Sequence, residues 1–273
     1  MNQLEKGNAF RDLHQGPLFI IPNPWDAGSA RLLAGLGAKA LATTSAGLAW
    51  TLGRRDGGVT RQEALYNAAQ IASAVELPVS GDLENGYGDA PDHAAETIRL
   101  AADVGLVGGS IEDASGNPEA PIYDFELSVR RVEAAAWVAH ALPFPFTFVA
   151  RAENFLHGRR DLSDTIRRLQ AYEAAGADVL FAPGLPDLDA IRTVVASVSK
   201  PLNVVLWQKQ SPYTIADLAA AGVQRVSSGG SFARAALSGL RDAAMEVLGP
   251  GTLSYLDGAI TTAEVHQYLP PKQ

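Results

Sequence analysis

The stretch Ala175–Phe181, which reads AGADVLF, joins the end of a helical pattern to a short apolar run through a single glycine. Gly176 lies where a helix would end, because glycine adopts the left-handed conformation of a helix C-cap without steric cost. The apolar residues that follow are typical of a strand buried on both faces. The same order of helix, glycine and strand recurs at Gly37, Gly105 and Gly222. This joint therefore predicts a repeated unit of one helix and one strand.

Short apolar runs alternate with longer amphipathic segments about eight times along the chain. The predicted strands are Pro17–Pro22, Ala40–Thr44, Pro78–Asp82, Gly108–Glu112, Phe146–Arg151, Asp178–Ala182, Pro201–Leu206 and Gln224–Ser228. The predicted helices are Asp26–Leu36, Thr60–Val75, Pro91–Val104, Asp124–Ala141, Asp161–Ala175, Asp187–Val198, Thr214–Ala221 and Ser231–Leu248. Eight such units with short joints favour a single (β/α)₈ barrel, and the alternative is an open doubly wound sheet.

Composition limits the classes of function. The chain has 22 Lys and Arg against 30 Asp and Glu, and this net charge of −8 disfavours a surface for duplex nucleic acid. Because there is no Cys, disulfides, thiolate zinc sites and cysteine catalysis are excluded. No apolar run approaches the roughly 20 residues of a membrane span, and the N-terminus lacks a signal-peptide pattern. We expect a cytoplasmic protein that forms one barrel domain over residues 1–273, with residues 250–273 as a C-terminal helical extension.

Carboxylates fall in several of the loops that follow predicted strands, and those loops carry the chemistry of a (β/α)₈ barrel. They are Asp56, Asp82, Glu84 and Glu112. Brought together, these groups would repel one another and raise their own pKa values. A divalent cation resolves that conflict, and an all-oxygen ligand set favours Mg²⁺, with Mn²⁺ as the other suitable ion. The sequence thus predicts Asp82, Glu84 and Glu112 as metal ligands; the alternative for each is a helix cap or a solvated loop charge.

Two further groups suit an anionic ligand. Arg151 follows the fifth predicted strand, and its planar guanidinium matches a carboxylate with two hydrogen bonds. The alternative for Arg151 is a structural ion pair with Glu153. Thr44, Ser45 and Ala46 follow the second strand and offer small side chains and backbone N–H groups to a second oxyanion.

Several short motifs in a fixed order carry a family resemblance. They are TTSAG (43–47) with LGRRD (52–56), DLENGYG (82–88), IED (111–113) and ARAE (150–153). Over about residues 10–245 the chain resembles the isocitrate lyase/phosphoenolpyruvate mutase superfamily. The resemblance implies a Mg²⁺-dependent barrel that acts on 2-oxo acids or their enolates and breaks or rearranges C–C or P–C bonds.

The resemblance also assigns roles to residues. It places the metal ligand on Asp82, its second acid on Glu84 and a water-mediated ligand on Glu112. It makes Arg151 the arginine for the substrate carboxylate and Asp56 the acid before the second helix. Members of the superfamily often exchange their eighth helix between subunits, which implies a homodimer or homotetramer built through the C-terminal helices.

Two departures from the superfamily bear on the reaction. Residues 114–121 (ASGNPEAP) replace the Lys-Arg-Cys-Gly-His loop of the lyases, and Pro183 replaces the histidine of the phosphonate enzymes. We expect cleavage of a C–C bond in a 2-oxo or dicarboxylic acid, as in an oxaloacetate decarboxylase or a substituted-malate lyase. Tyr87, Asp56 or a metal-ordered water would deliver the proton. The alternatives are a phosphonate enzyme and a non-catalytic barrel that binds a keto acid.

Overall fold

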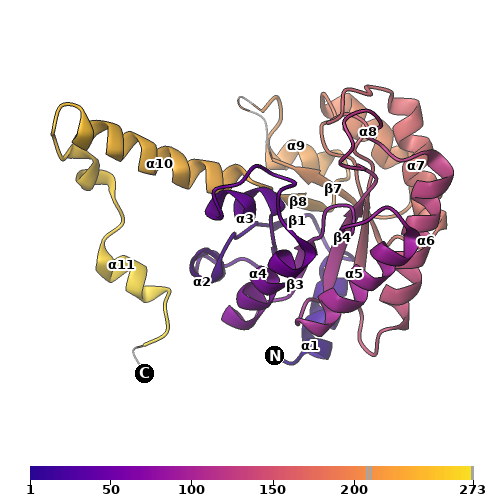
Figure 1. The fold of residues 1–273 in the computed structure, drawn as a ribbon, viewed down its shortest axis with the longest axis horizontal. Coiled ribbons are helices and arrows are strands. Elements are labelled where there is room, and N and C mark those ends of the chain that lie inside the picture. The colour runs from indigo at the N-terminus through magenta and orange to yellow at the C-terminus, as the bar shows by residue number, and fades with distance from the viewer. Residues whose placement is uncertain (207–208, 210, 272–273) are drawn as a thin grey trace.

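The computed structural model, described for residues 1–206, 209 and 211–271, contains one sheet of eight parallel strands. The strands are β1 (Phe19–Ile21), β2 (Leu41–Ala42), β3 (Val79–Asp82), β4 (Gly108–Glu112), β5 (Thr147–Arg151), β6 (Val179–Phe181), β7 (Leu202–Val205) and β8 (Arg225–Ser227). From β2 to β8 each strand pairs with the next one in the chain, and β1 pairs with β8, so the sheet curls into a barrel surrounded by helices (Figure 1). The predicted (β/α)₈ class is confirmed, and each strand lies within its predicted range.

The barrel closes between β1 and β2 through a few hydrogen bonds rather than a full ladder. The backbone N–H of Ala42 donates to the carbonyl of Pro22 over 3.1 Å. The buried side chain of Asn23 donates to the carbonyl of Thr43 over 2.7 Å and accepts from the N–H of Ser228 over 2.9 Å. One side chain therefore links the carboxyl ends of β1, β2 and β8.

The helices agree with the predicted ones in their N-caps and C-caps. They are α1 (Gln3–Leu13), α2 (Ala27–Gly35), α3 (Ser45–Thr51), α4 (Arg61–Ala74), α5 (Pro91–Asp103), α6 (Phe125–Ala141), α7 (Leu162–Ala174), α8 (Leu188–Ser197), α9 (Ile215–Ala220), α10 (Ser231–Leu248) and α11 (Thr262–Gln267), with a 3₁₀ helix η1 (Ser254–Gly258). The N-cap side chains that accept a hydrogen bond from a backbone N–H three residues ahead include Asp26, Thr60, Asp124, Asp161, Asp187 and Thr214. The glycines after α2, α5, α7 and α9 have φ between +86° and +104°, as C-caps require.

Two helices, α1 and α3, were not predicted. Helix α1 covers the amino ends of the strands: Phe10 is fully buried against Phe19, and the Lys6 ammonium donates to the carbonyls of Ala72 and Val75. Its polar sequence gives only a weak amphipathic pattern, so the burial of α1 depends on these distant contacts. Helix α3 starts at Ser45, inside the segment expected to be an anion-binding loop.

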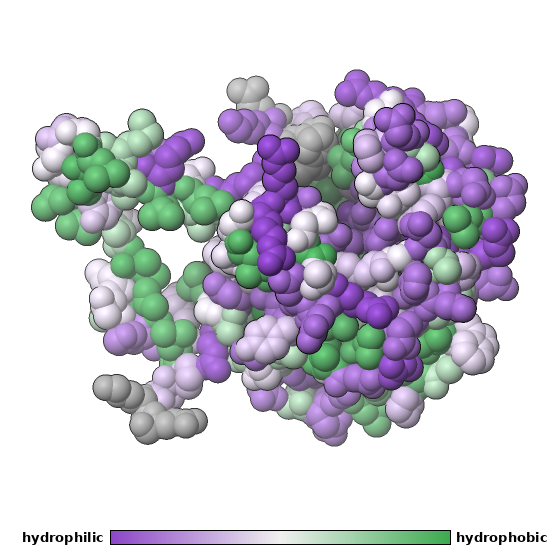
Figure 2. All heavy atoms as spheres, viewed as in Figure 1, coloured by the Kyte–Doolittle hydropathy of each residue, from purple (hydrophilic) through white to green (hydrophobic). Residues whose placement is uncertain are grey.

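Helix α10, η1 and α11 form a C-terminal arm that extends away from the barrel (Figure 1). Its apolar side chains face solvent, as the green surface of the arm in Figure 2 shows, and Leu240, Leu248 and Leu253 are between 58% and 86% exposed. The arm returns to the barrel at Tyr268, whose ring lies directly against Gly35 of α2. Residues 272 and 273 of the predicted extension lie outside the described part of the chain. Within that part, every helix is too short or too polar to span a bilayer.

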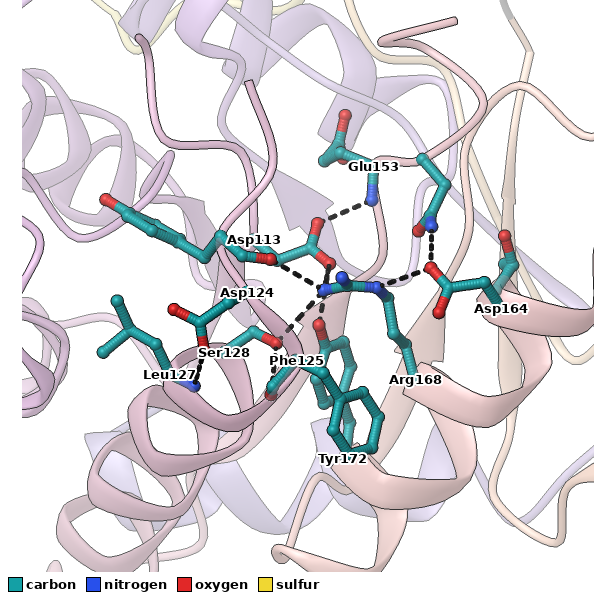
Figure 3. Close-up of polar contacts among 12 residues, drawn as sticks. Asp113, Asp124, Phe125, Leu127, Ser128, Glu153, Asp164, Arg168 and Tyr172 are labelled. Atoms are coloured by element: carbon teal, nitrogen blue, oxygen red, sulfur yellow. Dashed lines mark hydrogen bonds and ion pairs between the residues drawn. The ribbon is translucent and has the colours of Figure 1, made fainter. Parts of the chain in front are cut away.

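A buried polar network lies behind the carboxyl ends of β4 and β5 (Figure 3). Asp113 accepts from the backbone N–H of Glu153 over 2.8 Å, from the Tyr172 hydroxyl over 2.7 Å and from Arg168 Nη1 over 3.1 Å. Arg168 Nε donates in turn to Asp164 over 2.9 Å. Because Arg168 and Asp113 are almost fully buried, these bonds fix the loop after β5 against α7.

We expect Asp113→Ala to lower the free energy of unfolding by about 3–5 kcal/mol, because it removes the buried counter-charge of Arg168. Tyr172→Phe should cost about 1.5–3 kcal/mol, the value of one hydrogen bond to a charged group. Urea denaturation followed by circular dichroism measures both. The control Glu96→Ala removes an exposed ion pair with Arg99 and should cost less than about 1 kcal/mol. Similar costs for Asp113→Ala and Glu96→Ala would contradict this role of the network.

Candidate active site

A cavity of about 240 Å³ lies inside the barrel, toward the carboxyl ends of the strands. The predicted site residues that line it are Thr44, Ser45, Ala46, Asp56, Asp82 and Arg151. A wider hollow of about 790 Å³ lies at the opposite ends of the strands, around Arg11 and Lys200, and none of the predicted site residues lines it. The strand-end loops therefore gather most of the predicted residues around the smaller cavity.

Asp82, the last residue of β3, is fixed by three neighbours. Its Oδ1 lies 2.8 Å from Arg151 Nη1, and its Oδ2 accepts from the backbone N–H of Ser45 over 2.9 Å. Its own N–H donates to the Thr43 hydroxyl over 2.8 Å. The first N–H of α3, expected to bind a ligand oxyanion, is thus already used by Asp82.

Arg151, the last residue of β5, lies among three carboxylates. Besides Asp82 it contacts Glu112 over 3.0 Å and Glu153 over 2.8 Å, and its guanidinium lies 5.0 Å from the centre of the Phe181 ring. Burial opposes its charge, but the three carboxylates raise the pKa of Arg151 above its usual range. The Arg151–Glu153 ion pair, which the sequence left as the alternative role of Arg151, is therefore present. Arg151 also contacts two predicted site residues, Asp82 and Glu112.

Glu84 has an unusual conformation and an unsatisfied oxygen. Its φ of +49° is rare for a residue with a side chain, and its buried Oε1 has no hydrogen-bond partner among the described residues. Burial, and then the charges of Asp82 and Asp56, raise the pKa of Glu84 to about 7. Burial also raises the pKa of Glu112 well above its ordinary value, although Arg151 opposes that rise.

Tyr87 lies behind the acids and is not among the residues that line the cavity. It has a φ of +60° and packs on the buried cluster formed by Leu48, Ala49, Val59 and Ala64. Its hydroxyl is buried without a hydrogen-bond partner among the described residues. Burial, followed by the charges of Glu84 and Asp82, raises the pKa of Tyr87 above its usual range, so the phenol keeps its proton.

The donor set has the chemistry of a site for a hard dication. Four carboxylates (Asp82, Glu84, Glu112 and Glu153) against the one guanidinium of Arg151 leave three negative charges in excess when all are ionised. Mg²⁺ needs only one or two protein carboxylates, since water completes its shell. In the described part of the chain, no three acidic or histidine side chains are arranged as a ready set of metal ligands. The unpartnered Glu84 oxygen and the mutual repulsion of the acids fit a bound cation.

The loop that replaces the lyase motif folds upon itself. Ser115 N–H donates to the carbonyl of Pro121 over 2.9 Å, and its hydroxyl donates to Ala120 over 2.6 Å. None of residues 114–121 is among those that line the cavity, whereas Pro183 is. The cavity wall next to Pro183 is apolar, with Leu156 and Phe181. This loop therefore places no acid or base in the cavity.

Among the polar residues on the cavity wall that sequence reasoning missed are Asn203 of β7 and Arg225 of β8. Each lies inside a predicted buried strand, and a polar side chain at such a position was the available signal. The strands were predicted to be covered on both faces, and nothing in their pattern distinguishes a side chain that points into the barrel from one that points at the helices.

Comparison with known proteins assigns the chain to a family. A family model described as phosphoenolpyruvate phosphomutase matches residues 10–248. The 2-methylisocitrate lyase of Shewanella oneidensis is 30% identical, with 85% of this chain and 82% of that protein covered. The oxaloacetate decarboxylase of Pseudomonas entomophila is 29% identical, with coverage of 86% and 82%. A crystal structure from Burkholderia cenocepacia, described as a lyase/mutase, has a TM-score of 0.95 and 53% identity, with coverage of 97% and 96%.

The match begins within α1 and ends at the last residue of α10, so it includes all eight strands and each of the acidic loops around Arg151. The chain therefore belongs to the phosphoenolpyruvate phosphomutase family, within the isocitrate lyase/phosphoenolpyruvate mutase superfamily.

Proposed function

We propose that this protein is a Mg²⁺-dependent lyase that cleaves a C–C bond in a small 2-oxo acid. The observation that carries the proposal is the cluster in which Asp82, Glu112 and Glu153 surround Arg151 at the cavity. Two relatives are named for reactions of this class, a 2-methylisocitrate lyase and an oxaloacetate decarboxylase. Both names support a carboxylic acid as the substrate.

Asp82, Glu84 and Glu112 would hold the metal. When bound, Mg²⁺ supplies Lewis acidity, which stabilises the negative charge that develops on a keto oxygen as the neighbouring bond breaks. Mn²⁺ would supply the same chemistry through the same oxygens.

The side chains around the cavity bind and enclose the substrate. Arg151 Nη1 uses one N–H on Asp82 and has a second N–H for a substrate carboxylate. Thr44, Ser45 and Ala46 also line the cavity; Thr44 is the N-cap of α3, and Ser45 and Ala46 are its first two residues. Leu156 and Phe181 on the apolar wall exclude water, which strengthens the ionic contacts inside.

The proton for the product enolate has two candidate sources in the chain. Asp56 lines the cavity, so it can reach a bound acid directly. Tyr87 lies behind the acids and would act only through an intervening group. The position of Asp56 favours it as the donor.

Two alternatives remain distinguishable by experiment. A phosphonate enzyme would convert phosphonopyruvate, and ³¹P NMR would show loss of the phosphonate signal. A non-catalytic barrel would bind oxalate or 2-oxoglutarate in isothermal titration and turn over none of a panel of 2-oxo acids. Pro183 on the cavity wall favours the lyase over the phosphonate enzyme, because no histidine stands there to assist P–C chemistry.

We further propose that the C-terminal arm packs against a second copy of this chain, giving a homodimer or homotetramer. Leu240 and Leu237 of α10 border an apolar groove of about 170 Å³ beside Trp25 and Trp50. Farther along the arm, Leu248 is 86% exposed. Burial of these side chains against another subunit removes apolar surface from water, which a lone chain leaves exposed.

Replacing Asp82 by Ala should lower kcat/KM with a 2-oxo acid at least about 100-fold, because several kcal/mol of charge stabilisation depend on the metal. The assay follows oxaloacetate consumption with added Mg²⁺. The control Asp92→Asn changes an exposed acid in the first turn of α5 and should leave activity within twofold, as expected for a change far from the site. Wild-type activity of Asp82→Ala would refute the site.

For the proton donor, Asp56→Asn should lower kcat about 100- to 10,000-fold, the range of general acid catalysis. Tyr87→Phe should leave kcat largely intact while altering the packing behind the acids. The reverse pattern, with kcat lost only in Tyr87→Phe, would assign proton delivery to the tyrosine.

Light scattering after size exclusion should give two or four times the chain mass of 28.7 kDa. The double variant Leu240→Asp/Leu248→Asp should elute as a folded monomer, because a charge at each position opposes burial. Tyr66→Asp, a similarly exposed apolar position on α4 of the barrel, serves as the control and should keep the assembly. A wild-type monomer would disprove the role of the arm.

A further inference from the structure

Arg225 in β8 is a buried cation without a counter-charge among the described residues. It is 4% exposed, and its Nε and Nη1 have no hydrogen-bond partner in the described part of the chain. Its guanidinium lies 5.8 Å from the centre of the Phe10 ring. Burial alone lowers the pKa of Arg225 to about 9, with no carboxylate to oppose the change. The side chain therefore remains cationic at neutral pH in an environment that disfavours charge.

The other buried cations of the barrel have partners on the chain, although Arg131, which donates to the carbonyls of Asn85 and Gly88, has no partner for its Nε among the described residues. Lys6 donates to two backbone carbonyls, Arg168 pairs with Asp113 and Asp164, and Arg151 pairs with three acids. An unpaired buried charge is costly, so proteins pair such groups with an anion or a polar partner. Arg225 thus differs from these cations because its guanidinium makes neither a hydrogen bond nor an ion pair with any described residue.

The surroundings of Arg225 are polar and belong to the cavity already described. Arg225, Asn203 and Ser227 line the same cavity as Asp82 and Arg151. Asn203 donates to the Ser227 hydroxyl over 3.0 Å, while its own Oδ1 has no partner among the described residues. Unsatisfied donors and acceptors on one wall indicate a place for a polar ligand.

His14, on the other side of Phe10, does not serve as the missing partner. Its ring packs edge-on between Phe10 and Phe19, and its Nδ1 lies 2.8 Å from the Phe10 carbonyl. Burial, and then the charge of Arg225, lower the pKa of His14 to about 3, so it is neutral. Within the described part of the chain, no carboxylate therefore competes with a ligand anion for Arg225, and His14 adds no charge of its own.

We propose that Arg225 binds a carboxylate within the barrel, namely the second carboxylate of a dicarboxylic 2-oxo acid whose first lies at the Asp82–Arg151 end of the cavity. This assignment rests on the proposed function. The cavity of about 240 Å³ accommodates a small acid with a handful of carbon atoms. A guanidinium in this position selects dianionic substrates, because a monocarboxylate leaves the buried cation unpaired. Free chloride carries the same negative charge and is the alternative anion to pair with Arg225.

The test measures binding of 2-oxo acids in the presence of Mg²⁺ to wild type, Arg225→Met and the control Lys6→Met. Lys6→Met also removes a buried cation, but one remote from the cavity. Isothermal titration compares pyruvate and 2-oxobutyrate with 2-oxoglutarate and 2-oxoadipate, and oxalate probes the metal end alone. In wild type and Lys6→Met the best dicarboxylic 2-oxo acid should bind about 10- to 100-fold more tightly than the monocarboxylates.

Arg225→Met should lose that preference while its affinity for oxalate stays within about twofold, since it keeps the metal end intact. If Arg225→Met does not fold, Arg225→Gln provides the neutral variant and Arg225→Lys should keep part of the preference. A preference that survives in the neutral variant, or that is absent from the wild type, overturns the inference. Failure of oxalate to bind any form, with an Arg225-dependent preference retained, counts against the proposed metal site instead.

A chloride titration separates the two anion sources. If the substrate assignment is right, chloride in place of gluconate leaves the thermal midpoint of the wild type and of Arg225→Met equally unchanged. A chloride-dependent rise confined to the wild type, together with no preference for dicarboxylates, assigns the site to a free anion and overturns the substrate assignment.

Discussion

One guanidinium surrounded by acids is the interaction on which the rest of the site depends. Arg151 holds Asp82, Glu112 and Glu153 within 3.0 Å, so side chains from β3, β4 and the loop after β5 meet at one point. Arg151 cannot neutralise all of these carboxylates, and Glu84 adds another. Burial, reinforced by the excess negative charge, raises the pKa values of Glu84 and Glu112, and the same excess of charge makes the site suitable for a dication.

Hydrogen bonds from the surrounding elements hold the residues of this cluster in place. Asp113 anchors the backbone of Glu153 and is itself anchored by α7, so the carboxylate that meets Arg151 is held by buried bonds rather than by a mobile loop. Asp82 is similarly fixed by the first N–H of α3. None of residues 114–121 is among those that line the cavity. The proposed selection of the substrate therefore rests on the interior wall, where Arg225 lies, more than on that loop.

The sequence predicted the parts of the molecule that depend on local pattern. Eight apolar runs, acidic or hydroxyl N-caps and left-handed glycines were sufficient for the strands and most helices. The meeting of Asp82 with Arg151 followed from the rule that strand ends share one face of a barrel. Helix α1 was missed because Lys6 is satisfied only by carbonyls some seventy residues away. Arg225 was missed because a buried strand has no periodicity that identifies its inner face. The position of Tyr87 behind the acids depends on a left-handed backbone that its sequence does not reveal.

If the excess of carboxylates around Arg151 holds a divalent cation, the metal-free protein should bind Mn²⁺. Electron paramagnetic resonance of Mn²⁺ added to metal-free protein tests it without substrate or turnover, because free Mn²⁺ gives a strong signal that binding suppresses. About one equivalent of Mn²⁺ per chain should lose its free-ion signal, and added Mg²⁺ should restore that signal. A signal that rises in proportion to added Mn²⁺ from the first addition, as in buffer alone, would contradict the account.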